Sequence, residues 1–111
     1  KRNEEGFMEN IALTEAVYYI LLSLDQPLHG YGIMQNIERI SGGRVRLAAG
    51  TLYGALNSLL ERQWIRALPE EKGGRRKEYQ ITESGRVAVR REIERLKELL
   101  ANGECITVLW N

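Results

Sequence analysis

Several residue types that build catalytic and metal sites are scarce in this chain of 111 residues. A single cysteine excludes an internal disulfide framework, and a single histidine without a second ligand nearby argues against a metal site. Paired carboxylates and a phosphate-cradling glycine loop are also lacking, so we expect no catalytic residues and no cofactor. The longest nearly apolar run, residues 16–24, is too short to cross a bilayer, and no signal peptide is visible. These absences favour one domain in the reducing cytoplasm, without a membrane partner.

The charges are unevenly distributed, although 16 basic and 15 acidic residues nearly cancel. Residues 1–43 contain three basic and six acidic residues, whereas residues 44–77 contain eight basic and three acidic residues. A basic block without matching acidic residues is typical of a surface that binds nucleic acid.

Residues 48–65 predict an amphipathic helix with an unusual polar face. The apolar positions follow the helical repeat and are Leu52, Leu56, Leu59 and Leu60. The opposite face carries small polar groups where an ordinary solvated face has Lys and Glu. Small groups allow a helix to enter a DNA groove and bond to base edges. A plain surface helix with few charges explains this face equally well, so the next segment has to decide.

Two alternating runs, residues 64–68 and 77–81, predict the strands of a hairpin. The Gly-Gly pair at 73–74 predicts the turn, and the basic residues 75–77 follow it directly. Basic residues at a hairpin tip often serve only solubility and edge protection. Beside the polar helix face, however, we favour DNA, because a helix followed by a cationic hairpin is the outline of a winged helix.

The first helix is predicted within residues 14–24. Thr14 is a suitable N-cap for it, and residues 16–24 are apolar on nearly every side. Such a helix needs cover on more than one side, and in so short a chain we expect a second subunit to provide it. A central core helix in a monomer is the alternative.

A second helix is predicted from the spacing of Ile33, Ile37 and Ile40, and the glycines after Ser41 should end it. We expect His29, just before this helix, to serve in a turn or a cap. Residues 44–47 alternate in polarity and predict a minor strand that pairs beside the hairpin.

Four short motifs occur in an order that resembles the PadR family of bacterial transcriptional regulators. They are Leu28-His29-Gly30-Tyr31, Gly50-Thr51-Leu52-Tyr53, Gly73-Gly74-Arg75-Arg76-Lys77 with Tyr79, and Ile81-Thr82-Glu83-Ser84-Gly85. The resemblance covers roughly residues 13–100 and implies a winged-helix domain with a C-terminal dimerisation helix. It also implies operator binding as a homodimer, usually with repression. The short C-terminal part resembles the compact branch of the family, which includes multidrug-sensing repressors.

The chain departs from the family pattern at the start of the polar helix. Ala48 and Ala49 stand where the family usually has Ser-Pro, which removes a side-chain N-cap that is worth about 1 kcal/mol. Gly54 stands where the family usually has proline, and glycine inside a helix costs about 1 kcal/mol relative to alanine. We therefore expect a looser recognition helix whose first amides remain free for a phosphate.

The expected fold is mainly α with a small β-hairpin (α+β), a winged helix-turn-helix plus a C-terminal dimerisation helix. A flexible segment should occupy residues 1–12, the DNA-binding domain residues 13–81, the dimerisation helix residues 82–103, and an apolar tail residues 104–111. Thr82 is a suitable N-cap for the last helix, and Asn102-Gly103 should end it. The tail has a strand-like composition, and simple packing is its favoured role.

The candidate site residues form three groups. We expect DNA contacts from Arg44, Ala49, Gly50, Thr51, Tyr53, Gly54, Asn57, Ser58, Gly74, Arg75, Arg76 and Lys77. The predicted dimer interface combines the first helix with the apolar seam of the last and comprises Val17, Ile20, Leu21, Val89, Ile93, Leu96 and Leu100. A ligand cavity at the dimer seam, which the resemblance implies, has Tyr18, Tyr19 and Trp110 as its candidates.

The function favoured by these patterns is a sequence-specific DNA-binding regulator. We expect a homodimeric repressor on a palindromic double-stranded DNA operator, released by a small hydrophobic or aromatic effector. The alternative is a winged-helix module for protein interaction, which would share the fold but would not need a basic hairpin. The scarcity of catalytic residue types argues against an enzyme.

Overall fold

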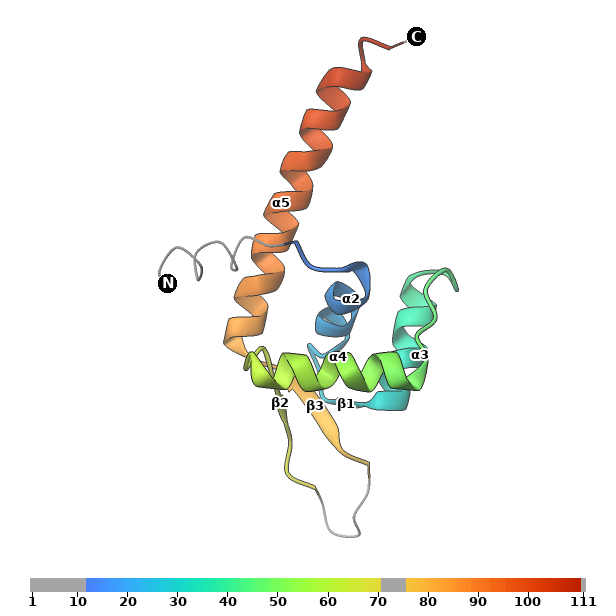
Figure 1. The fold of residues 1–111 in the computed structure, drawn as a ribbon, viewed down its shortest axis with the longest axis vertical. Coiled ribbons are helices and arrows are strands. Elements are labelled where there is room, and N and C mark those ends of the chain that lie inside the picture. The colour runs from blue at the N-terminus through green and yellow to red at the C-terminus, as the bar shows by residue number, and fades with distance from the viewer. Residues whose placement is uncertain (1–11, 71–75, 111) are drawn as a thin grey trace.

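The computed structural model describes residues 12–70 and 76–110, which contain four helices and three short strands (Figure 1). In chain order these elements are α2 (Glu15–Ser23), β1 (Leu28–His29), α3 (Gly30–Ile40), α4 (Ala49–Glu61), β2 (Ile65–Ala67), β3 (Glu78–Ile81) and α5 (Glu83–Thr107). The predicted α+β fold is confirmed. None of the helices in the described ranges is long and apolar enough to span a membrane.

The core lies where the three helices α2, α3 and α4 meet the sheet and the start of α5. Its fully buried side chains come from every one of these helices at helical spacing, and Ile20, Leu21, Leu24, Ile33, Ile37, Leu52 and Leu56 are at most 1% exposed. The apolar face predicted for residues 48–65 is thereby confirmed at Leu52 and Leu56. That of the second helix is confirmed at Ile33 and Ile37, whereas Ile40 is 39% exposed. Tyr79 and Ile81 close the core from the sheet.

The sheet has the order β1-β3-β2, and both pairs are antiparallel. Leu28 is opposite Tyr79 in one pair, and Ile65 is opposite Ile81 in the other. The strand predicted at residues 44–47 is wrong, because β1 and β2 already occupy both edges of β3. Residues 44–47 form a connection instead, held where the Val45 N–H donates to the Ser41 hydroxyl at 3.0 Å.

Helix α2 begins as predicted, with the Thr14 hydroxyl accepting the Val17 N–H at 3.1 Å. Much of its apolar surface is covered within the same chain, since α2 packs against both α3 and α5, although Leu22 is 37% exposed. Ile20 and Leu21 are 0% exposed, so the expectation that a second subunit must cover them is wrong. The alternative of a central core helix is the correct one for these two residues.

Helix α5 begins at the predicted cap, where the Thr82 hydroxyl accepts the Gly85 N–H at 3.2 Å. The predicted end at Asn102-Gly103 is wrong, because α5 continues to Thr107. A terminating glycine adopts a left-handed backbone, and among the described glycines only Gly42 and Gly43 have a positive φ. The tail predicted from residue 104 is therefore mostly helical, and α5 projects beyond the rest of the molecule (Figure 1).

Candidate nucleic-acid interface

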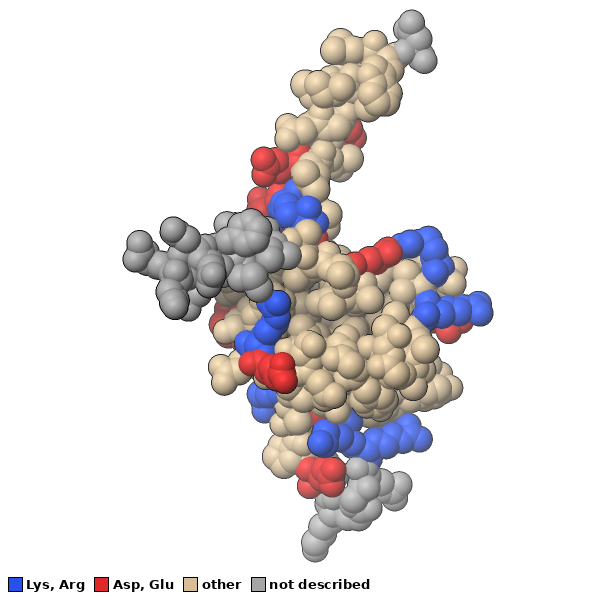
Figure 2. All heavy atoms as spheres, viewed as in Figure 1, with Lys and Arg blue, Asp and Glu red and all other residues tan. Residues whose placement is uncertain are grey.

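Helix α4 presents the two faces that its sequence predicts. Leu52, Leu56 and Leu59 are at most 2% exposed, whereas the small polar groups of the other face are exposed. That exposed set comprises the predicted DNA-contact residues Ala49, Gly50, Thr51, Gly54, Asn57 and Ser58. In Figure 2, the surface over α4 is largely uncharged, with Lys and Arg gathered below it toward the hairpin.

The first turn of α4 lacks a side-chain cap. Ala48 is the N-cap residue and makes no side-chain hydrogen bond. The departure from Ser-Pro therefore has the predicted structural consequence, since the first amides of the helix remain available to an acceptor.

Tyr53 extends toward the start of α3 as well as toward solvent. A Cβ atom at Gly30 would lie 2.3 Å from the Tyr53 hydroxyl oxygen, so this close approach requires glycine. The Tyr53 side chain is still 45% exposed. It thus connects α4 to α3 and keeps a polar group at the surface.

The hairpin carries basic residues on β2 and just before β3. Arg66 on β2 donates to the Gln80 side-chain oxygen at 3.0 Å, which orients one guanidinium across the sheet. Arg76 and Lys77 precede β3 and are exposed. Gly74 and Arg75, also predicted to contact DNA, lie outside the described residues.

Arg44 is not part of this group. Its guanidinium forms an ion pair with Glu15 in the first turn of α2. The hydrogen bond from Arg44 lowers the pKa of the Glu15 carboxyl below its usual value. The structure therefore engages Arg44 with α2 and does not place it with Arg76 and Lys77.

Sequence reasoning gave His29 a capping role and no place in the DNA site. The capping role is confirmed, because His29 Nδ1 accepts the Gly32 N–H at 3.0 Å. The other ring nitrogen, Nε2, lies 3.2 Å from a guanidinium nitrogen of Arg76. No signal in the sequence indicates this contact, because the Leu-His-Gly-Tyr motif does not specify a partner 47 residues away.

The predicted seam on α5 is apolar but becomes steadily more exposed along the helix. Val89 is 8% exposed, Leu96 41% and Leu100 62%, with Ile93 partly buried against the core. Further large apolar side chains are exposed beyond the seam, namely Leu99, Ile106, Val108, Leu109 and Trp110. Of the seam partners predicted on α2, Val17 is partly buried, and Ile20 and Leu21 are enclosed in the core.

The three aromatic residues predicted to line a ligand cavity do not meet within one chain. Tyr18 and Tyr19 are neighbours on α2, with ring centroids 6.1 Å apart. Trp110 follows the end of α5, the part of the chain that projects away from α2 (Figure 1).

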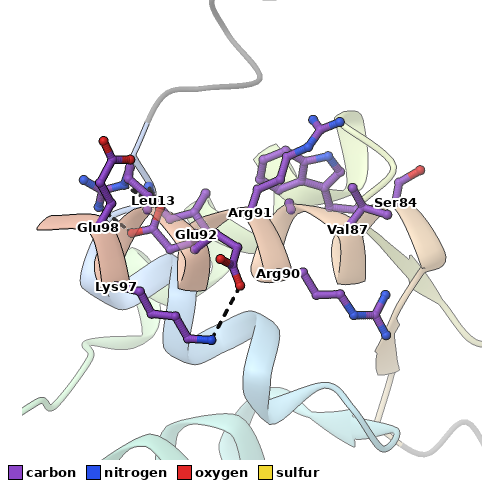
Figure 3. A pocket seen from close by; sticks show the side chains of 12 residues that line it. Leu13, Ser84, Val87, Arg90, Arg91, Glu92, Lys97 and Glu98 are labelled. Carbon is purple, nitrogen blue, oxygen red and sulfur yellow. Dashed lines mark hydrogen bonds and ion pairs between the residues drawn. The ribbon is translucent and has the colours of Figure 1, made fainter. Parts of the chain in front are cut away.

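A groove of about 1140 Å³ runs along α5 (Figure 3). Its walls are mostly charged side chains of this single helix, among them Arg90, Lys97 and Glu98. Beneath them Glu92, 5% exposed, accepts hydrogen bonds from Arg95 at 2.6 and 2.9 Å and from the Leu13 N–H at 3.3 Å. This buried carboxylate fixes the segment before α2 against α5, a connection that had no signal in the sequence.

Comparison with known proteins decides the family. The model of the transcriptional regulator PadR-like family matches residues 19–91, which covers α3, α4, all three strands and most of α2. The chain belongs to the PadR-like family.

Solved structures agree with this assignment. A PadR family regulator from Eggerthella lenta is 24% identical, with a TM-score of 0.66 over 86% of this chain and 82% of that one. A PadR family regulator from Clostridium difficile is 23% identical, with a TM-score of 0.64 over 86% and 99% of the two chains. At these identities the likeness establishes the winged-helix fold; in that fold the helix at the position of α4 is called the recognition helix and the hairpin at the position of β2–β3 the wing.

A sequence relative is an uncharacterized 37.1 kDa protein in transposon TN4556 of Streptomyces fradiae. It is 41% identical over 86 residues, which make up 77% of this chain and 24% of that protein. The chain thus spans only about a quarter of the curated relative that it matches.

Proposed function

We propose that this PadR-like chain is a cytoplasmic repressor that binds a palindromic DNA operator as a homodimer. The observation that carries the proposal is the exposed, small and uncharged face of α4 beside the basic residues Arg76 and Lys77 just before β3. In a winged helix, such a face enters the major groove while the wing contacts the adjacent backbone. Residues 13–81 then form the DNA-binding unit, and α5 forms the dimerisation unit.

Selection of bound sequences from random duplex DNA tests this function directly. We expect enrichment of a palindrome whose half-sites are about 34 Å apart, one turn of DNA, because two-fold symmetry relates the recognition helices. Affinity should also fall steeply as salt rises. Binding to no duplex would refute the proposal and favour the winged-helix protein-interaction module, whose contacts need not depend on salt in this way.

The dimer is supported by the exposed apolar side chains along the second half of α5. Burial of one leucine or isoleucine stabilises an assembly by about 1.5–3 kcal/mol, so several on one helix provide a substantial driving force. Ile93, Leu96 and Leu100 share one side of α5. Since Ile20 and Leu21 are enclosed, we propose that α5 packs against its symmetry mate and the partly exposed surface of α2 around Val17.

The assembly is tested by light scattering on Ile93→Glu/Leu96→Glu. Two buried carboxylates at the seam are poorly tolerated, so the variant should be monomeric and should lose operator binding. Glu98→Lys is the control, because Glu98 lies on the opposite side of α5 and is exposed. A folded wild-type monomer at micromolar concentration that still binds a single half-site would refute the dimer.

Release by a small hydrophobic or aromatic effector completes the proposal. Dimerisation is the event that would bring Trp110 to Tyr18 and Tyr19, because within a single chain Trp110 lies far from these two neighbouring rings. The variant Trp64→Phe leaves Trp110 as the sole tryptophan. A panel of planar aromatic compounds should quench its emission and weaken operator binding together, and quenching without any effect on DNA affinity would refute the effector role.

A further inference from the structure

A small cavity of about 360 Å³ lies between α3, α4 and the start of β3. Its polar lining includes His29, Tyr31, Tyr53, Arg76 and Lys77. None of the described residues that line it is acidic. Hydrogen-bond donors from three separate segments of the chain therefore converge on one space.

The hydrogen bonds of His29 determine which ring nitrogen donates into this cavity. Because Nδ1 accepts the Gly32 N–H, it carries no proton, and the proton of the neutral ring is on Nε2. Nε2 lies 3.2 Å from Nη1 of Arg76, and a guanidinium has donors only. With Nδ1 as the acceptor for Gly32, both Nε2–H and the guanidinium N–H can donate to one acceptor placed beside them.

Tyr53 brings a further polar group to the same place. Its hydroxyl lies against Gly30, where any Cβ atom would come within 2.3 Å. Gly30 and His29 thus serve one local arrangement, in which the glycine admits the tyrosine and the histidine caps α3 while directing Nε2 outward. An oxyanion would satisfy the His29, Arg76 and Tyr53 donors together, which a cation or an apolar ligand would not.

We propose that this cavity binds one backbone phosphate of the operator DNA, with His29 and Arg76 donating to the same phosphate. The proposal rests on the proposed function and adds His29 to the DNA-contacting residues. Contacts of this kind set the register of a protein on the duplex and do not read sequence. The cavity adjoins both α4 and the wing, so one phosphate held there would fix the two relative to the groove.

Two variants separate the roles of the two side chains. His29→Asn keeps the N-cap, because asparagine is among the best capping residues, but removes the Nε2 donor. Its affinity for every duplex should fall roughly tenfold, the effect of one lost hydrogen bond to a charged group. The salt slope should stay unchanged, since the donor removed is neutral. Arg76→Gln removes a charge and should lower the salt slope by about one unit.

A double-mutant cycle on a short random-sequence duplex tests the shared phosphate. His29→Asn/Arg76→Gln should bind more tightly than the product of the single losses predicts, because the two residues serve one contact. Arg66→Gln is the matched control, since Arg66 is on the wing but does not line the cavity. Combined with His29→Asn, it should give multiplicative losses.

Several outcomes would overturn the proposal. If His29→Asn bound DNA with unchanged affinity and unfolded at the wild-type temperature, the proposed phosphate contact of His29 would be refuted. The proposed DNA-binding function would still stand. Multiplicative losses in the His29–Arg76 cycle would assign the two residues to separate contacts. A wild-type chain that binds no duplex would refute the proposed function as well.

A final titration distinguishes DNA from a soluble phosphate compound. Inorganic phosphate is added at constant ionic strength while the His29 ring resonances are followed by NMR. Duplex DNA should shift these resonances at concentrations where phosphate alone does not. Saturation by phosphate at lower concentration than by DNA would assign the cavity to a small phosphorylated ligand and overturn the DNA assignment.

Discussion

Replacement of Gly85 by alanine should destabilise the protein even though it improves the helix propensity of α5. Gly85 is buried in the first turn of α5, and a Cβ atom there would lie 2.2 Å from the Trp64 carbonyl oxygen and 2.7 Å from Ile81 Cγ1. Ordinary contact begins at 3.4 Å, so the helix would have to move by roughly 1 Å.

The cost follows from what that movement disturbs. The Thr82 N–H donates to the Trp64 carbonyl at 3.0 Å, and the Thr82 hydroxyl donates to the Gln63 carbonyl at 2.7 Å. Overpacking typically costs about 1–3 kcal/mol, and each strained hydrogen bond adds about 1 kcal/mol. The gain from alanine in a helix is about 1 kcal/mol. We expect a net destabilisation of about 2–4 kcal/mol, which lowers Tm by roughly 4–8 °C per kcal/mol.

Thermal unfolding at a fixed protein concentration measures this effect, and Gly54→Ala is its control. Gly54 is also inside a helix, but nothing lies within 4 Å of its Cβ position. Gly54→Ala should therefore stabilise the protein by about 1 kcal/mol. If Gly85→Ala raised Tm as Gly54→Ala does, the close packing of α5 on the Trp64 backbone would be refuted.

Three further predictions concern the site and its support. Asn57→Ala should weaken the free energy of binding to the preferred operator by about 1–3 kcal/mol and binding to random DNA only slightly, because amide side chains pair with adenine edges. Binding titrations measure both, and equal losses would show that Asn57 contacts the DNA backbone. Ala48→Ser should restore the missing cap and raise the free energy of unfolding by about 1 kcal/mol in urea titrations, whereas no gain would mean that the serine hydroxyl does not cap α4. The hydrogen bond from Arg95 lowers the pKa of the Glu92 carboxyl below its usual value, although burial opposes this shift. A carboxyl with a lowered folded-state pKa stabilises the fold above its unfolded pKa and loses that effect as pH falls through the folded value. The stability difference between wild type and Glu92→Gln should therefore shrink below about pH 4.5, while the exposed control Glu94→Gln should show little difference at any pH.

Local features of the fold could be predicted because they depend on neighbours in sequence. Thr14, His29 and Thr82 each bond to an amide three residues ahead, so their capping roles require only the right residue before a helix. The two faces of α4 follow from the helical repeat in the same way. The absence of a cap at Ala48 is likewise evident from the residue type alone.

Predictions that required knowledge of distant partners failed. The short strand was assigned to residues 44–47, but Leu28–His29 takes that place because β3 offers its free edge there. Ile20 and Leu21 were assigned to a dimer interface because the apolar pattern of α2 cannot reveal whether α5 of the same chain covers them. The predicted end of α5 is wrong for a different, local reason: asparagine followed by glycine permits a helix to stop without requiring it.

The sequence by itself determined the order of the elements, the caps, the polar face of the recognition helix and the basic charge of the wing. These properties are set by residue type and by spacing within a few positions. Only the tertiary structure decided that His29, Tyr53 and Arg76 line one cavity, and that the carboxylate of Glu92 fixes the segment before α2 to α5. Those relations join residues more than twenty positions apart, and the packing of several elements together, not any local preference, brings them close to one another.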